Sequence, residues 1–278
     1  MNIVLTNDDG INSPGLWEIA DCLSEICNLT VVVPDRDQSG KGVSLTLLRP
    51  LSIERVQSRV KGVDNVYTVD GTPADCVIMA AGYICSEKID LVVSGINQGA
   101  NLGLDVFHSG TFGAALQAYN KGIEAIALSV LYKEGIYNRP AAEIGAKLAE
   151  VLMNTSEDRE NPLLLNVNFP HAELEDIKGV DLTTLGPRGF SERVEQVVNG
   201  RREFYWIKFD RPADEDPLGG TDVWAVRNNR VSITSVNPFM SDLNQSTDVL
   251  SITESIRKSI PSQKSSLNHF RILGRHEP

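Results

Sequence analysis

The chain has 278 residues, of which 41% are hydrophobic and 23% are charged, and its formal net charge is −11. No apolar run approaches the roughly 20 residues of a membrane-spanning helix, and the acidic charge opposes general binding to a nucleic-acid backbone, which requires Lys and Arg. Residues 1–9 lack the basic start of a signal peptide and reach two carboxylates early. We therefore expect a cytoplasmic protein that has neither a membrane nor a nucleic-acid polymer as a partner.

The first half of the chain alternates short β-branched and apolar runs with helical patterns. This alternation predicts an α/β fold with a doubly wound, mostly parallel, Rossmann-like sheet. The predicted elements, in chain order, are a strand at 3–5, a helix at 16–26, strands at 29–33, 51–53 and 66–69, a helix at 73–81, a strand at 89–93, a helix from about 110, a strand at 125–128, a helix through 144–151 and a strand at 163–167.

The character of the sequence changes near Gly179, where β-rich segments separated by polar stretches begin. The predicted strands of this part lie at 204–207, 223–226 and 231–234. The last two are expected to form a hairpin around Asn228 and Asn229, whose side chains tolerate the positive φ of a tight turn. We therefore divide the chain into a Rossmann-like core at 1–178 and a β-rich extension with a C-terminal tail at 179–278.

Polar segments follow four of the predicted strands at their carboxyl ends, which is where open α/β sheets bind their ligands. These segments are 7–10, 34–40, 70–72 and 94–101. Their oxygen-bearing side chains are therefore expected to converge on one edge of the sheet. The negative charge of the whole chain does not exclude a small phosphorylated ligand there, because a bound metal ion reverses the local field.

Asp8 and Asp9 follow the first predicted strand directly. Adjacent residues of a strand point to opposite faces, so these two carboxylates can share an ion only if the strand has ended, and Gly10 favours a turn there. Close carboxylates repel one another unless a cation neutralises them. Hard oxygen ligands without a histidine or cysteine cluster favour Mg²⁺ or Mn²⁺ over Zn²⁺. The alternative interpretation is that the pair caps the following helix.

A second group of polar residues precedes the helix predicted from about residue 110. Ser109, Gly110 and Thr111 would present hydroxyl and backbone donors at the positive end of the helix dipole, which suits a phosphate group. Ser and Thr are also preferred N-caps, so capping is the alternative. The neighbouring His108 is a candidate general acid, but a single histidine beside a serine forms no triad.

Several sequence blocks in this order resemble the SurE survival-protein family. They are Leu5–Gly10, Pro34–Asp35 with Gln38–Gly40, Gly71–Val77, Ser94–Asn101 and Ser109–Thr111, with weaker similarity at Asn166–Pro170 and Thr221–Val226. Five blocks in register make the resemblance specific, and it covers residues 1–130 most firmly.

The resemblance implies a 5'-nucleotidase, a phosphomonoesterase acting on nucleoside monophosphates, sometimes with 3'-monophosphates, other phosphoesters or short polyphosphate as substrates. It implies one divalent cation per subunit, Mg²⁺ or Mn²⁺, held by Asp8, Asp9, Ser39 and Asn97. It also implies that the β-rich C-terminal part makes subunit contacts in a homodimer or homotetramer. Family members often carry Tyr at the position of His108.

These lines together suggest a mechanism in which the phosphate is oriented by four side chains, those of Asn97, Asn101, Ser109 and Thr111. Either a metal-activated water or Asp8 is the nucleophile, and we favour water. A receiver-type Mg²⁺-binding signalling module with Asp70 as phosphoacceptor is the alternative, although such modules are much shorter than this chain. A haloacid-dehalogenase-like phosphatase is disfavoured because that family places its two aspartates one residue apart.

Overall fold

The computed structural model describes residues 1–132, 138–155, 159, 161–186, 191–199, 202–210, 217–239 and 247–259. The strands are β1 (Asn2–Thr6), β2 (Asn28–Pro34), β3 (Ile53–Arg55), β4 (Asn65–Val69), β5 (Leu91–Gln98), β6 (Glu124–Val130), β7 (Leu164–Phe169), β8 (Val180–Thr183), β9 (Ser191–Asn199), β10 (Arg202–Asp210) and β11 (Val231–Ser235). The α-helices are α1 (Pro14–Ser24), α2 (Pro73–Met79), α3 (Gly110–Asn120), α4 (Arg139–Asn154), α5 (Asp222–Arg227) and α6 (Thr247–Ser259). A π-helical turn η1 (Ala80–Ile84) and the 3₁₀ turns η2 (Gly103–Phe107) and η3 (Leu174–Asp176) complete them.

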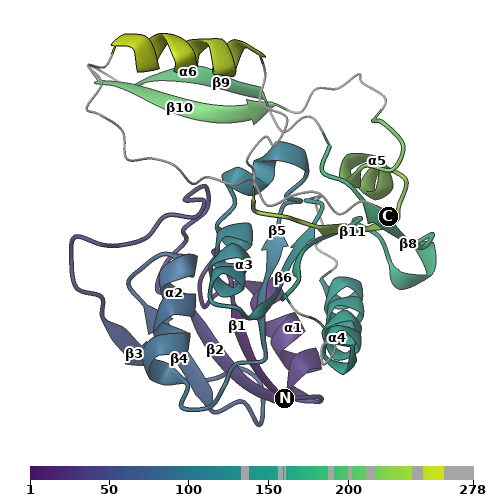
Figure 1. Cartoon of the computed structure of the whole chain (residues 1–278). Helices are drawn as coiled ribbons and strands as arrows, with labels where there is room; N and C mark the ends of the chain where they lie inside the picture. The colour runs from purple at the N-terminus through teal and green to yellow at the C-terminus, as the bar shows by residue number, and fades with distance from the viewer. Residues whose placement is uncertain are drawn as a thin grey trace. The chain divides into compact units, whose positions relative to one another are not determined.

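The described residues form a nine-stranded sheet in the order β3-β4-β2-β1-β5-β6-β7-β11-β8 (Figure 1). The six consecutive strands from β4 to β7 are parallel, whereas β3 and β11 run antiparallel to β4 and β7. Helices cover both faces, so the predicted doubly wound α/β fold is confirmed. The carboxyl ends of β1, β2 and β5 are adjacent at one edge, and this adjacency positions the site described below.

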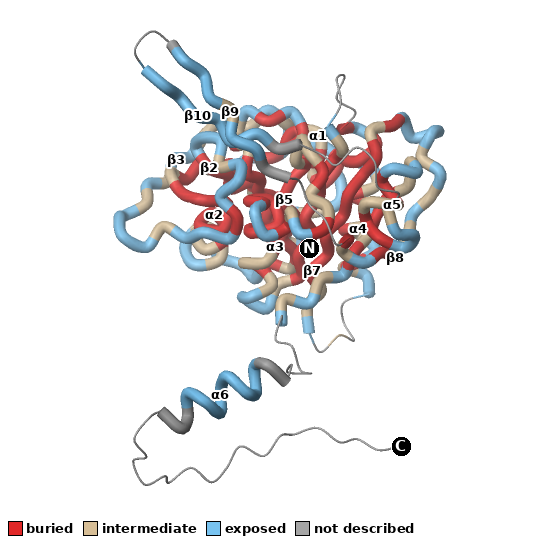
Figure 2. The backbone as a smooth tube through the Cα atoms, turned by 90° about the horizontal axis from the view of Figure 1, so that it is seen from above, coloured by how far each residue is buried: buried red, intermediate tan, exposed pale blue. Residues whose placement is uncertain are grey.

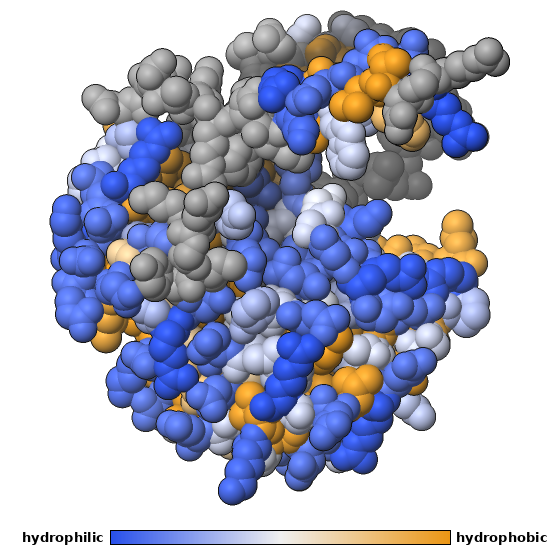
Figure 3. Space-filling view, turned by 180° about the vertical axis from the view of Figure 1, so that it is seen from behind, coloured by the Kyte–Doolittle hydropathy of each residue, from blue (hydrophilic) through white to orange (hydrophobic). Residues whose placement is uncertain are grey.

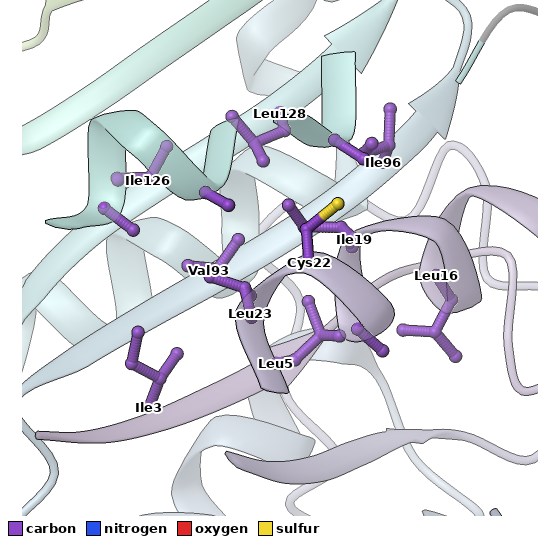
Figure 4. Close-up of a cluster of buried hydrophobic side chains, with 14 of the residues drawn as sticks. Ile3, Leu5, Leu16, Ile19, Cys22, Leu23, Val93, Ile96, Ile126 and Leu128 are labelled. Atoms are coloured by element: carbon purple, nitrogen blue, oxygen red, sulfur yellow. The ribbon is translucent and has the colours of Figure 1, made fainter. Parts of the chain in front are cut away.

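Each face of the sheet has its own apolar cluster, because successive strand residues point to opposite sides. Leu5 and Val93 lie in the cluster under α1 and α4, whereas Val4 and Val92 lie in the cluster under α2 and α3. Figure 4 shows the first cluster, with side chains of β1, β5 and β6 facing Ile19 and other residues of α1. Both faces of the parallel strands are therefore buried, which explains why these strands read as nearly continuous apolar runs.

The sheet does not end at residue 178, where we expect the core to end. β11 pairs with β7, and β8 pairs with β11, so two strands from the predicted extension complete the main sheet. The first compact unit accordingly runs from Met1 to Pro238, and the second comprises Phe239–Pro278. The change in sequence character near Gly179 does not interrupt the hydrogen bonding of the main sheet.

The predicted strand at 223–226 is wrong, because these residues lie in the helix α5. Thr221 caps this helix, with its hydroxyl accepting a hydrogen bond from the Trp224 N–H at 3.3 Å. The β-branched residues that suggested a strand are overridden by this N-cap and by the burial of Ala225 and Val226. The positive φ expected at the following turn is confirmed at Asn229, where φ is 57°.

The predicted strand at 204–207 is confirmed within β10, which pairs antiparallel with β9 in a separate hairpin. The residues of this hairpin whose burial is described are largely exposed, and the backbone tube is pale blue there in Figure 2, whereas the central strands of the main sheet are red. The molecular face in Figure 3 is predominantly hydrophilic, in keeping with the net charge of −11. Within the described residues, none of the helices combines the length and apolar character that crossing a bilayer requires.

Candidate functional site

The chain turns immediately after β1 and brings Asp8 and Asp9 to the edge of the sheet. The buried Asn7 side chain closes this turn, accepting from the Gly10 N–H at 3.1 Å and donating to the Gly10 carbonyl at 3.0 Å. Gly10 has a φ of 81°, and a Cβ there would lie 3.1 Å from the Pro34 carbonyl oxygen. The turn that the two carboxylates need in order to share an ion is therefore present.

Asp8 contacts the first turn of α3, although α1 is the helix that follows Asp8 in the sequence. It is only 3% exposed, and its Oδ1 accepts the Thr111 hydroxyl at 2.6 Å. The backbone amide of Thr111 is also close enough to lower the pKa of this carboxylate. Burial raises the pKa of Asp8, and the hydrogen bonds from Thr111 act in the opposite direction. Asp8 thus occupies the anion position at the N-terminus of α3.

Asp9 is partly buried and has contacts on two sides. The Ser13 hydroxyl donates to Oδ2 at 3.4 Å, and the backbone amide of Gln98 at the end of β5 acts on the pKa of Asp9 in the lowering direction. Burial raises the pKa of Asp9 to about 7, with further contributions from the negative charges of Asp8 and Asp37. The N-cap of α1 is Ser13, without a side-chain capping bond, so Asp8 and Asp9 do not cap that helix.

The loop after β2 reaches the same place. The Gln38 N–H donates to the Asp8 carbonyl at 2.8 Å. Ser39 is exposed, and it donates to Oδ1 of Asp37 both through its backbone N–H, at 2.7 Å, and through its hydroxyl, at 2.5 Å. The carboxylate of Asp37 acts electrostatically on Asp8 and Asp9. Asp37 is therefore a site residue that the sequence analysis does not identify, because an acidic residue in a polar loop is commonplace.

Asn97 lies at the carboxyl end of β5, next to Gln98, whose backbone amide acts on the pKa of Asp9. Its Nδ2 donates to the Gly99 carbonyl at 2.7 Å, which leaves Oδ1 as the oxygen available to a ligand. Asn101 follows in the same loop, but its Nδ2 donates to the Ser129 hydroxyl at 2.8 Å. The structure therefore ties the side chain of Asn101, one of the residues expected to bind phosphate, into β6.

Of the three residues expected to bind phosphate at the start of α3, two have their side chains engaged within the protein. Ser109 is the N-cap, and its Oγ accepts from the Phe112 N–H at 3.0 Å, as the capping alternative predicts. Thr111 donates to Asp8. Gly110 packs against Asp8, since a Cβ there would lie 2.8 Å from the Cβ of Asp8. These residues therefore lie beside Asp8 at the start of α3.

His108 and Asp70 are less closely connected to this site. His108 is exposed at the end of η2, and its backbone carbonyl accepts from the Gly42 N–H at 3.0 Å. Asp70 accepts from Arg49 Nη1 at 2.7 Å and from the Ser52 N–H at 2.7 Å, and these hydrogen bonds hold the pKa of Asp70 below its usual range. Asp70 thus already serves as an internal acceptor, which disfavours the phosphoacceptor of a receiver-type module.

The donor set around Asp8 and Asp9 fits a hard divalent cation. Among the residues that the structure describes, no ion pair involves either carboxylate, so no Lys or Arg offsets their charge. Within the described part of the chain, no group of three or more His, Cys, Asp or Glu side chains is placed to hold a metal ion by itself. The remaining oxygens on this edge are the Ser39 hydroxyl and Asn97 Oδ1, which are acceptable to Mg²⁺ or Mn²⁺ and poor ligands for softer metals.

Comparison with known proteins agrees with this geometry. The family model of survival protein SurE matches residues 3–192. The 5'-nucleotidase SurE of Dehalococcoides mccartyi is 37% identical over 271 residues, which span 94% of this chain and 100% of that protein. The 5'-nucleotidase SurE of Nitrosomonas eutropha is 42% identical over 248 residues, or 88% of this chain and 95% of that protein. The crystal structure of the SurE protein from Aquifex aeolicus superimposes with a TM-score of 0.75 at 35% identity, covering 93% of this chain and 99% of that one. The chain therefore belongs to the SurE family.

Proposed function

We propose that this chain is a 5'-nucleotidase that hydrolyses nucleoside 5'-monophosphates to nucleoside and phosphate with one divalent cation per subunit. The relatives named above, which carry the name 5'-nucleotidase SurE, support this assignment. The observation that carries the proposal is the adjacency of Asp8 and Asp9. Both have a raised pKa, and neither has a cationic partner among the described residues. Such a pair is stabilised by a bound cation.

The cation is Mg²⁺ or Mn²⁺, and when bound it supplies charge neutralisation and polarisation of a phosphoryl oxygen. Asp8 and Asp9 hold it through their carboxylates, and Asn97 contributes Oδ1 because its Nδ2 is bound to Gly99. Ser39 contributes its hydroxyl oxygen. The hydrogen bond from that hydroxyl to Asp37 directs the proton away and leaves the oxygen lone pairs for the ion.

We assign the orientation of the phosphate to residues at the start of α3 and to residues at the end of β5 and in the loop that follows it. Gly110 brings the helix backbone against Asp8, and Asn97 and Asn101 flank the same edge. Ser109 and Thr111 act indirectly, by capping α3 and by orienting Asp8. We favour water as the nucleophile, because Oδ1 of Asp8 already accepts the Thr111 hydroxyl.

The assignment is tested by phosphate release from a panel of nucleoside 5'-monophosphates in EDTA and with added Mn²⁺ or Mg²⁺. We expect turnover with a metal ion and none in EDTA. The panel includes 3'-monophosphates and short polyphosphate, which we propose as secondary substrates. Stoichiometric labelling by a small phosphodonor, without turnover of any nucleotide, would instead identify a receiver-type module.

The nucleophile is tested separately with ³²P-labelled substrate. After rapid acid quenching, the protein should carry no label if water attacks the phosphorus directly. Label on Asp8 would show that the carboxylate attacks first.

We also propose that the protein works as a homodimer or homotetramer in the cytoplasm. The support is the hairpin β9–β10, on which Val194, Tyr205, Trp206 and Ile207 are between 58% and 69% exposed. A two-stranded hairpin is marginally stable alone, and an exposed apolar surface of this kind is characteristic of protein–protein contacts. A second copy of the chain is the proposed partner, and a mass measurement in solution tests it.

A further inference from the structure

The loop between β5 and η2 is held in place by side chains from distant strands. The Asn101 backbone N–H donates to Oδ1 of Asn168 at 2.8 Å. The Asn101 carbonyl accepts from Nδ2 of Asn166 at 2.9 Å and from Nδ2 of Asn168 at 3.0 Å. Both asparagines are fully buried on β7. Their amide groups therefore fix the backbone of the loop that carries Asn101 and directly follows the β5 end bearing Asn97.

A buried carboxylate fixes the other end of the same loop. Asp222 has no exposed surface, and its Oδ2 accepts from the Gly103 N–H at 2.7 Å, across a sequence separation of 119 residues. Its Oδ1 accepts from the N–H groups of Gly186 and Val223, both at 2.8 Å. The side chain thus connects three separate parts of the chain.

Three backbone amides are the partners of this carboxylate, and no ion pair of the described residues includes it. Burying a carboxylate is costly unless hydrogen bonds replace its hydration. An asparagine at the same position has one oxygen instead of two, and its NH₂ group would face an N–H donor. The arrangement at Asp222 is therefore specific for two acceptor oxygens.

We propose that Asp222 is a positioning residue that holds Gly103, and with it the loop that carries Asn101 and follows Asn97, in the geometry needed next to Asp8 and Asp9. This inference rests on the proposed function. Its consequence is that α5 and the turn at Gly186 complete the active site without contacting the substrate. The predicted effect is mainly on kcat, since groups that act on the reacting phosphate must be aligned in the transition state.

The test compares Asp222→Asn with Asp181→Asn. The control breaks an ion pair in the same part of the chain, where Arg230 binds Asp181 at 2.6 and 2.8 Å, and this pair is outside the site. Activity is measured with a nucleoside 5'-monophosphate and Mn²⁺, well below the melting temperature of each variant. Amide hydrogen exchange is followed by mass spectrometry on peptides spanning residues 97–107.

For Asp222→Asn we expect kcat to fall about 10-fold or more with a smaller change in KM, and exchange in residues 97–107 to accelerate about 10-fold. Asp181→Asn should lose stability while keeping both kcat and loop exchange. A folded Asp222→Asn with normal kcat would overturn the proposal. Equal losses of kcat in both variants would also overturn it, because they would indicate a general effect on stability.

A milder variant covers the case in which Asp222→Asn does not fold. In Gly186→Ala the new Cβ would lie 3.0 Å from Cγ2 of Val223 and 3.2 Å from Oδ1 of Asp222, so these side chains must shift by a few tenths of an ångström while the carboxylate keeps its charge. A reduced kcat and faster loop exchange are expected, and unchanged values would contradict the proposal.

If the wild-type protein releases no phosphate from any nucleotide, the proposed function fails. The exchange data then still decide whether Asp222 holds the loop.

Discussion

Thr111 donates its hydroxyl to Oδ1 of Asp8 across 2.6 Å, linking residues 103 positions apart in the chain. This contact makes α3 a support for the acidic pair. Because Asp8 is buried, the bond decides the orientation of the carboxylate and, through it, the geometry of the proposed cation site.

Thr111→Val is expected to lower both stability and activity. Valine has nearly the same shape but cannot donate, so a buried hydrogen bond to a carboxylate is lost, at a cost of about 1–3 kcal/mol. The pKa of Asp8 should rise further, because the hydrogen bond from the Thr111 side chain counteracts the effect of burial. Calorimetry should show the lower melting temperature, and kcat/KM with Mn²⁺ should fall by about 10-fold.

Thr183→Val is the matched control. The Thr183 hydroxyl lies 2.8 Å from that of Ser232 and 2.7 Å from that of Thr234, between β8 and β11. This variant should also lose stability but keep its activity per folded molecule. If it lost as much activity as Thr111→Val, the role of Thr111 in orienting Asp8 would be disproved.

Gly110→Ala is expected to displace Asp8. The added methyl group would lie 2.8 Å from the Cβ and 3.0 Å from Oδ2 of Asp8, closer than ordinary van der Waals contact allows. Phosphate release should fall by roughly 100-fold, since small misplacements of reacting groups carry large rate penalties. Gly82→Ala is the control, because nothing lies within 4 Å of its added Cβ. Full activity of Gly110→Ala would show that the close packing of Gly110 on Asp8 is unimportant.

Metal binding should depend on pH through Asp9. Its pKa rises from 3.8 to about 7 on folding, so without a metal the folded state holds an extra proton between these values. The contribution of Asp9 to the free energy of unfolding is therefore greatest below about pH 4 and decreases as the pH rises towards 7. A cation competes with that proton, and its stabilising effect should grow from pH 5 to pH 7 and then level off.

Thermal unfolding with and without Mn²⁺ at several pH values measures this effect. The increase in melting temperature caused by Mn²⁺ should be small at pH 5 and largest at pH 7 and above. Asp9→Asn should show a smaller increase with a weaker pH dependence, because Asp8, whose pKa is also raised, remains. An increase that is largest at pH 5 in the wild type would contradict the assignment.

The exposed hairpin should determine the oligomeric state. Val194 and Ile207 are directly paired on one face of the hairpin and are 69% and 68% exposed. Replacing both with Ser should reduce the mass measured by light scattering after gel filtration, because the apolar area of the proposed contact is lost. The retained hydrogen-bond ladder should leave the core folded. An unchanged mass, or a wild-type protein that is already monomeric, would refute this assembly role.

The central part of the fold was predictable from the sequence because its signals are local. The apolar runs around Val4, Val32 and Val92 predict buried parallel strands. Gly10, which directly follows the acidic pair, predicts the turn after the first strand. The loops after β1, β2 and β5 could be expected to meet, because open α/β sheets bind their ligands at the carboxyl ends of the strands. The candidate metal site could therefore be assembled from residues far apart in the chain.

Other features depend on tertiary contacts that no local pattern encodes. Thr111 is typical of a helix start, and only its contact with Asp8 shows what it binds. Asp37 could be recognised only from its charge near Asp8 and Asp9. The residues after Thr221 contain β-branched side chains, yet capping and burial make them helical. The positions of β8 and β11 in the sheet also depend on tertiary contacts, namely their pairing with other strands, and not on the character of the local sequence.

The central claim is that Asp8 and Asp9 hold a divalent cation for phosphate-ester hydrolysis. The most direct test measures phosphate release from one nucleoside 5'-monophosphate, first in EDTA and then with excess Mn²⁺, for the wild type and Asp9→Asn. We predict no release in EDTA, rapid release by the wild type after Mn²⁺ is added, and a loss of about 100-fold or more in the folded variant. Equal activity of the wild type in EDTA and Mn²⁺, or full activity of Asp9→Asn, would contradict the account.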